Sequence, residues 1–229
     1  MNVFEAIDTR ISVPALTDPG PTDAQWEILL RAGARAPDHG RLQPWRFLIV
    51  RGAARELLGD VMAEALRASK PDTPLETLDR ERRKPLRAPA LLVVAVVPVP
   101  HSGVPEIEQI LADGAAAQNI LLAAHALGLG AIWRTGAPAY SDDVARALGL
   151  PAQSRIVAFI YLGAPHAPAI RSAAAEPPSA VDWGQPRENS PCRRGNHKFV
   201  SIRSLVHLRA RATTLGCSLH PKARTTPPT

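Results

Sequence analysis

Residues 35–50 of this 229-residue chain read RAPDHGRLQPWRFLIV. Pro37 and Pro44 restrict the backbone at the two ends of a polar loop, and the apolar run 45–50 that follows is typical of a β-strand. Just upstream, residues 22–25 form a capping-box pattern that opens a helical stripe of apolar residues. The stretch therefore predicts a helix, a polar loop and a strand, with the loop held rigidly enough to carry binding residues.

The apolar spacing of the remaining chain predicts an α+β fold in which helices flank a central mixed sheet. Residues 90–97 are apolar at every position, as expected of a central strand that helices cover on both faces. Residues 69–84 are charged and contain proline, and are expected to be either mobile or helical. The predicted helices span residues 1–11, 22–35, 53–67, 106–127 and 141–149; the predicted strands span residues 45–50, 90–97 and 155–162, with a strand or loop at 131–136.

The composition is 45% hydrophobic and 21% charged, which excludes collagen-like, coiled-coil and wholly disordered chains. The net charge of +6 and the pI near 10.0 suggest at first a polyanion partner. However, residues 184–229 hold nine basic residues and one acid, whereas residues 1–183 hold 18 basic and 20 acidic residues. We expect a folded domain over residues 1–173 without an electrostatic case for nucleic acid, and a largely irregular, Pro/Arg-rich basic tail over residues 174–229.

Neither a metal site nor a membrane partner is expected. Cys192, His197, Cys217 and His220 all lie in the tail, but their spacing matches no standard zinc finger. Residues 1–8 contain acids where a secretory signal needs basic residues, and the apolar runs are too short or too polar to span a bilayer. These features predict a cytoplasmic protein.

Three clusters are candidate binding elements, and the first is Arg10-Ile11-Ser12. A guanidinium beside a small hydroxyl can hold a phosphate through charge-assisted hydrogen bonds. The alternative is an arginine that is simply solvated at the surface.

The second cluster lies in the polar loop that precedes the strand at residues 45–50. Arg35 and His39 can donate to the carbonyl oxygens and ring nitrogens of a planar heterocycle. The alternative is a structural loop in which Asp38 caps a turn and Trp45 packs in the core.

The third cluster is Trp133-Arg134-Thr135. The indole can form an apolar wall for a ring, while Arg134 and Thr135 hold an anionic group. The alternative is Trp133 in the core with Arg134 extending to solvent. Neither a nucleophile elbow nor a phosphate-loop motif accompanies these clusters, so no catalytic side chain is predicted.

The order of the clusters resembles the nitroreductase family of FMN-dependent oxidoreductases, most closely its short YdjA-type branch. The resemblance covers about residues 1–170, and the combination of Arg-Ala-Pro-Asp-His with Gln-Pro-Trp is its most specific part. The stretches that carry it are Thr9-Arg10-Ile11-Ser12, Pro21-Thr22, residues 30–39, Gln43-Pro44-Trp45, residues 131–136 and Tyr161-Leu162-Gly163.

This resemblance implies a nitroreductase-like fold and a homodimer with two FMN molecules, each in a cleft built from both chains. It implies that Arg10 and Ser12 hold the phosphate and ribityl chain, with Ile11 where the family usually has a second basic residue. Arg35 and His39 are implied to reach the flavin. Trp133, Arg134 and Thr135 are implied to complete the pocket, and Ala123, Ala124, His125, Ala126, Leu127 and Gly128 to match a stretch associated with the nicotinamide nucleotide.

The implied activity is an FMN-dependent transfer of hydride from NAD(P)H, through the flavin, to nitroaromatic or similar electron-poor acceptors. The flavin carries this chemistry, which agrees with the lack of a catalytic side-chain pair in the sequence. The alternative is a non-catalytic flavin-binding or nucleic-acid-associated protein that acts through its basic tail.

Overall fold

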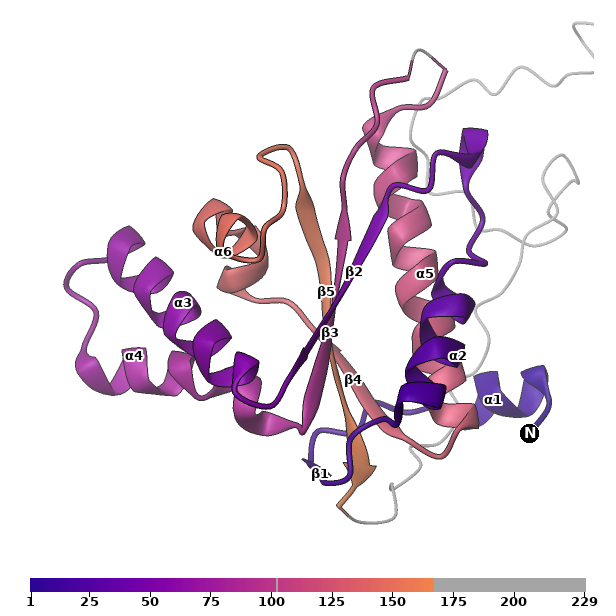
Figure 1. Ribbon diagram of the computed structural model, residues 1–229, viewed down its shortest axis with the longest axis horizontal. Coiled ribbons are helices and arrows are strands. Elements are labelled where there is room, and N and C mark those ends of the chain that lie inside the picture. Colours follow the sequence, from indigo (N-terminus) through magenta and orange to yellow (C-terminus); the bar gives the residue numbers. More distant parts are fainter. Residues whose placement is uncertain (102, 167–229) are drawn as a thin grey trace, which may run out of the picture. The chain divides into compact units, whose positions relative to one another are not determined.

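Strand β3 (Ala90–Val96) is buried at every residue, in the interior of a five-stranded sheet (Figure 1). The computed structural model describes residues 1–101 and 103–166. Three predictions fall outside the described residues: the basic tail, its boundary at residue 173, and the two cysteines and two histidines considered for zinc. The sheet has the order β1-β5-β3-β2, and β4 also pairs with β5. The other strands are β1 (Leu16–Thr17), β2 (Trp45–Arg51), β4 (Gly130–Arg134) and β5 (Arg155–Pro165).

The α+β class and the helices on both faces of the sheet are confirmed. The expected mixture of strand directions is not found among the described strands, because all four of their pairings are antiparallel. The uniformly apolar sequence of β3 is typical of parallel sheets. Here it reflects burial by helices on both faces, and burial carries no information on strand direction.

Two groups of helices cover the sheet. Figure 1 shows α2 (Asp23–Gly33) and α5 (Glu106–Ala126) on one face, and α3 (Ala54–Ser69), α4 (Leu75–Arg82) and α6 (Asp142–Ala147) on the other. Helix α1 (Val3–Thr9) lies beside one end of α5. Short 3₁₀ turns precede β2, β3 and α6, at η1 (His39–Arg41), η2 (Lys84–Arg87) and η3 (Ala137–Tyr140).

A local sequence signal determines where α2 begins. The capping box predicted at the start of α2 is confirmed: Thr22 accepts from the backbone N–H of Gln25, and the Gln25 side chain accepts from that of Thr22. Residues 69–84, predicted to be either mobile or helical, contain helix α4.

None of the described helices is both long enough and apolar enough to cross a membrane.

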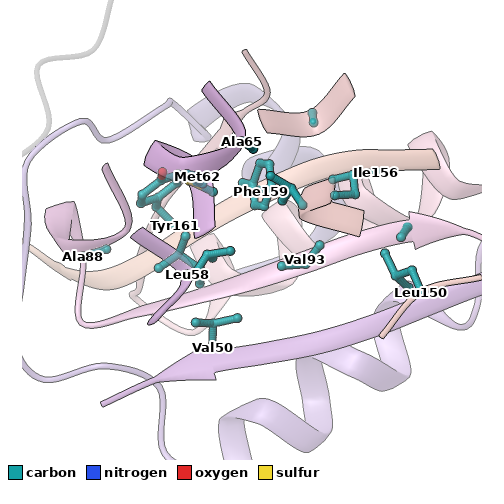
Figure 2. Close-up of a cluster of buried hydrophobic side chains, with 14 residues drawn as sticks. Val50, Leu58, Met62, Ala65, Ala88, Val93, Leu150, Ile156, Phe159 and Tyr161 are labelled. Carbon is teal, nitrogen blue, oxygen red and sulfur yellow. The ribbon is translucent and has the colours of Figure 1, made fainter. Parts of the chain in front are cut away.

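The sheet separates two hydrophobic cores, because successive side chains of a strand point to opposite faces. Figure 2 shows the core toward α3 and α6, where Leu58 and Met62 of α3 lie over Val93 of β3 and Phe159 of β5. The second core, toward α2 and α5, includes Trp26, Leu29, Leu92, Val94, Ala117, Ile120 and Ile160.

Helices α3 and α4 approach each other so closely that only glycine fits at residue 59. A Cβ atom placed on Gly59 would overlap the backbone carbonyl oxygen of Arg82, at the end of α4. Backbone cannot move aside as a flexible side chain can, so the pairing of these helices depends on this glycine.

We predict that Gly59→Ala lowers the free energy of unfolding by about 1–3 kcal/mol, because the new methyl group forces α4 away from α3. Leu57→Ala is the matched control on the same helix, since Leu57 is 67% exposed and its replacement should change stability by no more than about 0.5 kcal/mol. Urea unfolding of the two variants measures the difference. Equal stability of the two variants would show that the close approach does not constrain the fold.

Candidate functional site

The first cluster lies where α1 ends, between two hydrogen bonds to the α5–β4 corner. Thr9 Oγ1 is 2.8 Å from His125 Nε2 in the last turn of α5. Four residues later, the backbone N–H of Val13 donates to the carbonyl oxygen of Ala131 in β4, at 3.0 Å. Only Arg10, Ile11 and Ser12 lie between these two attachments.

Arg10 is half-buried and Ser12 is exposed. Within residues 1–101 and 103–166, the Arg10 guanidinium has neither an acidic partner nor a hydrogen-bond acceptor. A partly buried cation without an acid is expected to bind an anion, and the neighbouring hydroxyl adds a hydrogen-bond donor. The donor set at the end of α1 therefore fits a phosphate group.

The loop that carries the second cluster has unusual backbone geometry. Gly40, Arg41 and Gln43 have φ angles of 76°, 54° and 48°, which L-amino acids with side chains rarely adopt. Asp38 holds the turn, because its Oδ2 accepts from the backbone N–H of Gln43 at 2.7 Å. The structure thus supports the alternative interpretation of Asp38 as a turn cap, and such backbone conformations tend to occur at functional sites.

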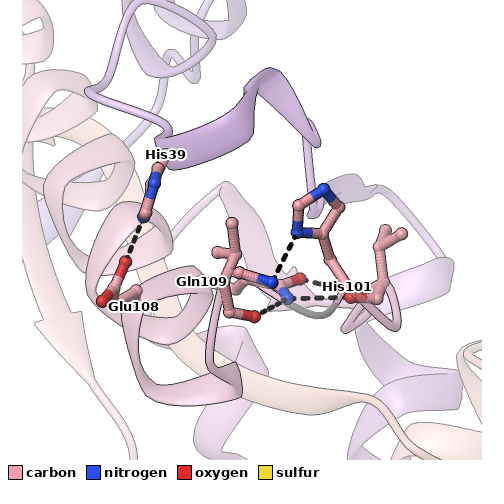
Figure 3. Close-up of polar contacts among 7 residues, drawn as sticks. His39, His101, Glu108 and Gln109 are labelled. Carbon is pink, nitrogen blue, oxygen red and sulfur yellow. Dashed lines mark hydrogen bonds and ion pairs between the residues drawn. The ribbon is translucent and has the colours of Figure 1, made fainter.

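His39 is held by α5 rather than by another residue of its own loop. Its Nδ1 lies 2.5 Å from Oε2 of Glu108, in the first turn of α5 (Figure 3). Close by, Gln109 is buried and uses its side chain to bind the backbone N–H and carbonyl of Val99. This end of α5 therefore organises both the predicted binding loop and the segment that follows β3.

The predicted contacts are distributed along α5 and are not gathered at one point of the chain. Thr9 contacts His125, and His39 contacts Glu108. Between these positions, the side chain of Asn119 donates at 3.2 Å to the carbonyl oxygen of Ala32, three residues before Arg35. Residues 108 and 125 are 17 positions apart, or about 25 Å at 1.5 Å per residue. A single chain thus places His39 far from Arg10.

The third cluster is divided between the two faces of the sheet. Trp133 packs against the core toward α2 and α5, and its Nε1 donates to the carbonyl oxygen of Val157 at 3.1 Å. Arg134, the next residue, points to the opposite face, toward Tyr161. Burial raises the pKa of Tyr161, and the charges of Arg87 and Arg134 oppose that rise. Trp133 and Arg134 cannot both point into one cavity, which favours the alternative of Trp133 in the core.

Residues 123–128 form the C-terminal end of α5. Gly128 has a φ of 76°. Its backbone N–H donates to the backbone carbonyl of His125, and the N–H of Leu129 donates to the backbone carbonyl of Ala124. This Schellman pattern commits the backbone donors of the turn to helix carbonyls. The end of a helix also carries partial negative charge. The segment therefore offers little to the phosphates of a nicotinamide nucleotide through its backbone.

Comparison with known proteins agrees with the resemblance given by the sequence. Residues 7–164 match the family model described as "Nitroreductase family". The chain is 38% identical over 165 residues to "Putative NAD(P)H nitroreductase YdjA" of Escherichia coli (strain K12), covering 72% of this chain and 89% of that protein. The chain belongs to the nitroreductase family.

Solved structures of this oxidoreductase family have the same fold. A "putative nitroreductase in complex with fmn" from Desulfovibrio desulfuricans is 30% identical, with a TM-score of 0.58, and the match covers 76% of this chain and 92% of that one. A nitroreductase-like family protein from Bacillus cereus is 25% identical, with a TM-score of 0.60, over 80% of this chain and 92% of that one. The expected nitroreductase-like fold is therefore confirmed.

Sequence reasoning does not predict the unusual environment of Asp113 in this nitroreductase fold. Asp113, in α5, is fully buried, and neither of its carboxyl oxygens has a hydrogen-bond partner among the described residues. Desolvation raises its pKa to about 7, with Arg46 lowering and Asp38 raising the value. The signal in the sequence was an acid on the apolar stripe of a helix, one turn after the buried Gln109.

Asp113 should make the protein less stable as the pH rises. Its pKa is about 7 when folded and about 3.9 when unfolded, so the folded state binds more protons between these values and stability falls through this window. We predict that Asp113→Asn is more stable than the wild type at pH 8 by about 2 kcal/mol, and that the advantage disappears near pH 4.

Thermal or urea unfolding at several pH values measures this difference. The matched control is Asp72→Asn, because Asp72 is exposed and its replacement should leave the pH profile unchanged. A wild-type profile that is parallel to that of Asp113→Asn from pH 4 to 8 would mean that Asp113 is not held as a neutral acid.

Proposed function

We propose that this protein is an FMN-dependent oxidoreductase that uses NAD(P)H to reduce nitroaromatic or similar electron-poor compounds. The observation that carries the proposal is the half-buried Arg10, which lacks an acidic partner among the described residues and lies two residues from the Ser12 hydroxyl. The chain belongs to the nitroreductase family, and a relative of 30% identity is described as an FMN complex. We therefore infer that the anion bound by Arg10 is the phosphate of FMN. Consumption of NAD(P)H favours a cytoplasmic location.

Bound FMN would supply the hydride-transfer chemistry between the nicotinamide and the acceptor. The protein's own contribution is to bind and orient. Arg10 and Ser12 would hold the phosphate and ribityl end through charge-assisted hydrogen bonds. The backbone at Arg134 and Thr135, where β4 ends, would line the flavin site, and Arg35 and His39 would donate hydrogen bonds to the ring.

A homodimer follows from the distribution of these residues along α5. Because His39 and the end of α1 contact positions of α5 that are about 25 Å apart along the helix, we propose that each cleft takes Arg10 and Ser12 from one chain and Arg35 and His39 from the partner. The surface of α5 supports this assembly. Ile107 and Leu111, one helical turn apart, are 58% and 64% exposed, and large apolar side chains that share an exposed face mark an interaction surface.

Loss of the Arg10 charge should weaken FMN binding but not riboflavin binding, because riboflavin lacks the phosphate. We predict that Arg10→Ala raises the Kd for FMN about 10- to 100-fold, the effect of one hydrogen bond between charged groups. The Kd for riboflavin should stay within about twofold. Fluorescence titration of the apoprotein measures both constants.

Arg31→Ala is the matched control, because Arg31 is exposed and paired with Glu27 on α2, and it should bind FMN as the wild type does. The wild-type protein loaded with FMN should oxidise NADH or NADPH faster when a nitroaromatic acceptor is added. A protein that binds no FMN, or that shows no such acceleration, is not the proposed reductase.

The dimer is tested by a charge on the exposed face of α5. We predict that Leu111→Glu shifts the protein from dimer to monomer at micromolar concentration, because burying an unpaired carboxylate at an interface is costly. Leu75→Glu is the matched control, since Leu75 is 80% exposed on α4. Sedimentation velocity measures the oligomeric state; a dimer that survives Leu111→Glu would place the interface elsewhere.

A further inference from the structure

The segment that carries Arg10 is attached on both sides to one corner of the fold. Upstream, Thr9 meets His125 in the last turn of α5, and downstream Val13 bonds to Ala131, the second residue of β4. The α5–β4 connection between these points is the tight turn at residues 127–129. The chain from residue 10 to residue 12 is therefore a short bridge across a single rigid corner.

Packing strengthens the attachment on the Val13 side. A Cβ atom placed on Gly130 would come within 2.5 Å of Leu16 Cδ2 and within 3.3 Å of Val13 Cγ1. The chain after Ser12 thus lies directly against the first residue of β4. On the Thr9 side, the attachment to α5 is the side-chain hydrogen bond to His125.

The direction of that hydrogen bond can be assigned. Thr9 Oγ1 lies 2.6 Å from the carbonyl oxygen of Glu5 and donates its only proton there. Oγ1 can then only accept from His125, so Nε2 of the imidazole carries a proton and is the donor. The assignment holds for the neutral Nε2–H tautomer and for the protonated ring alike.

We propose that Thr9 and His125 are positioning residues for the phosphate site, holding the end of α1 so that Arg10 points at the phosphate. This rests on the proposed function. It gives His125 a role different from contact with the nicotinamide nucleotide, which the resemblance implies. A guanidinium binds phosphate well only along defined directions, so a helix end that is free to shift loses affinity without losing charge.

The experiment uses two pairs of variants in the full-length protein. Thr9→Val and His125→Leu remove the hydrogen bond with little change in volume. Thr9→Ser retains the hydroxyl, and His125→Gln retains an N–H donor near the position of Nε2. We expect Thr9→Val and His125→Leu each to raise the Kd for FMN about five- to tenfold, as for the loss of one hydrogen bond, with riboflavin unaffected.

The conservative variants should bind FMN within about twofold of the wild type, and the double variant Thr9→Val/His125→Leu should bind no more weakly than either single variant. The KM for NAD(P)H at saturating FMN should not change. An unchanged Kd for FMN together with a raised KM in His125→Leu would overturn the proposal and place His125 at the nucleotide.

Hydrogen exchange of the apoprotein supplies a readout that does not depend on FMN. We expect the amide of Arg10, which bonds to Ala6, to exchange about fivefold faster in Thr9→Val and His125→Leu, while amides of β3 keep their protection. If the wild type binds no FMN, the proposed function fails, and the exchange rates still decide whether the helix end is held. Unchanged exchange at Arg10 overturns the positioning role.

Discussion

Close packing of α5 against the sheet is the constraint on which the other features depend. The buried stripe of this helix is rich in alanine, with Ala112, Ala116, Ala117 and Ala124, and small residues let a helix lie near its neighbours. Gly33 of α2 extends this close packing, because a Cβ there would come within 2.8 Å of Ile120. A helix held so firmly along its length keeps its two ends a fixed distance apart.

This fixed distance is the reason for proposing that the flavin site is completed by a second chain. Glu108 fixes the 38–44 loop at one end of α5, and His125 meets the end of α1 at the other. Because the helix is rigid, these two contacts stay about 25 Å apart in a single chain. In the proposed dimer each chain therefore supplies two half-sites, and the exposed Ile107 and Leu111 provide the apolar surface for the contact between chains.

The sequence predicts local structure better than it predicts relations between distant residues. The start of α2 is predicted by the capping residues Thr22 and Gln25, and the end of α5 by Gly128, because these signals act within one helical turn. Strand directions did not follow, since burial of β3 on both faces is compatible with either direction. The split of Trp133 from Arg134 required residues 130–134 to be identified as a strand, after which the alternation of side chains dictates it.

The same distinction applies to the proposed phosphate site. Arg10 was identified from its residue type beside Ser12, but its surroundings depend on contacts with residues more than 100 positions away. Ile11, half-buried between the two attachments, stands where the resemblance implies a second basic residue. If FMN binds here as proposed, the segment has one guanidinium in place of two charges. Less of the affinity would then come from long-range attraction and more from the directional hydrogen bonds of Arg10. Such bonds require a fixed origin, so the loss of charge at Ile11 increases the importance of the contacts that hold the helix end.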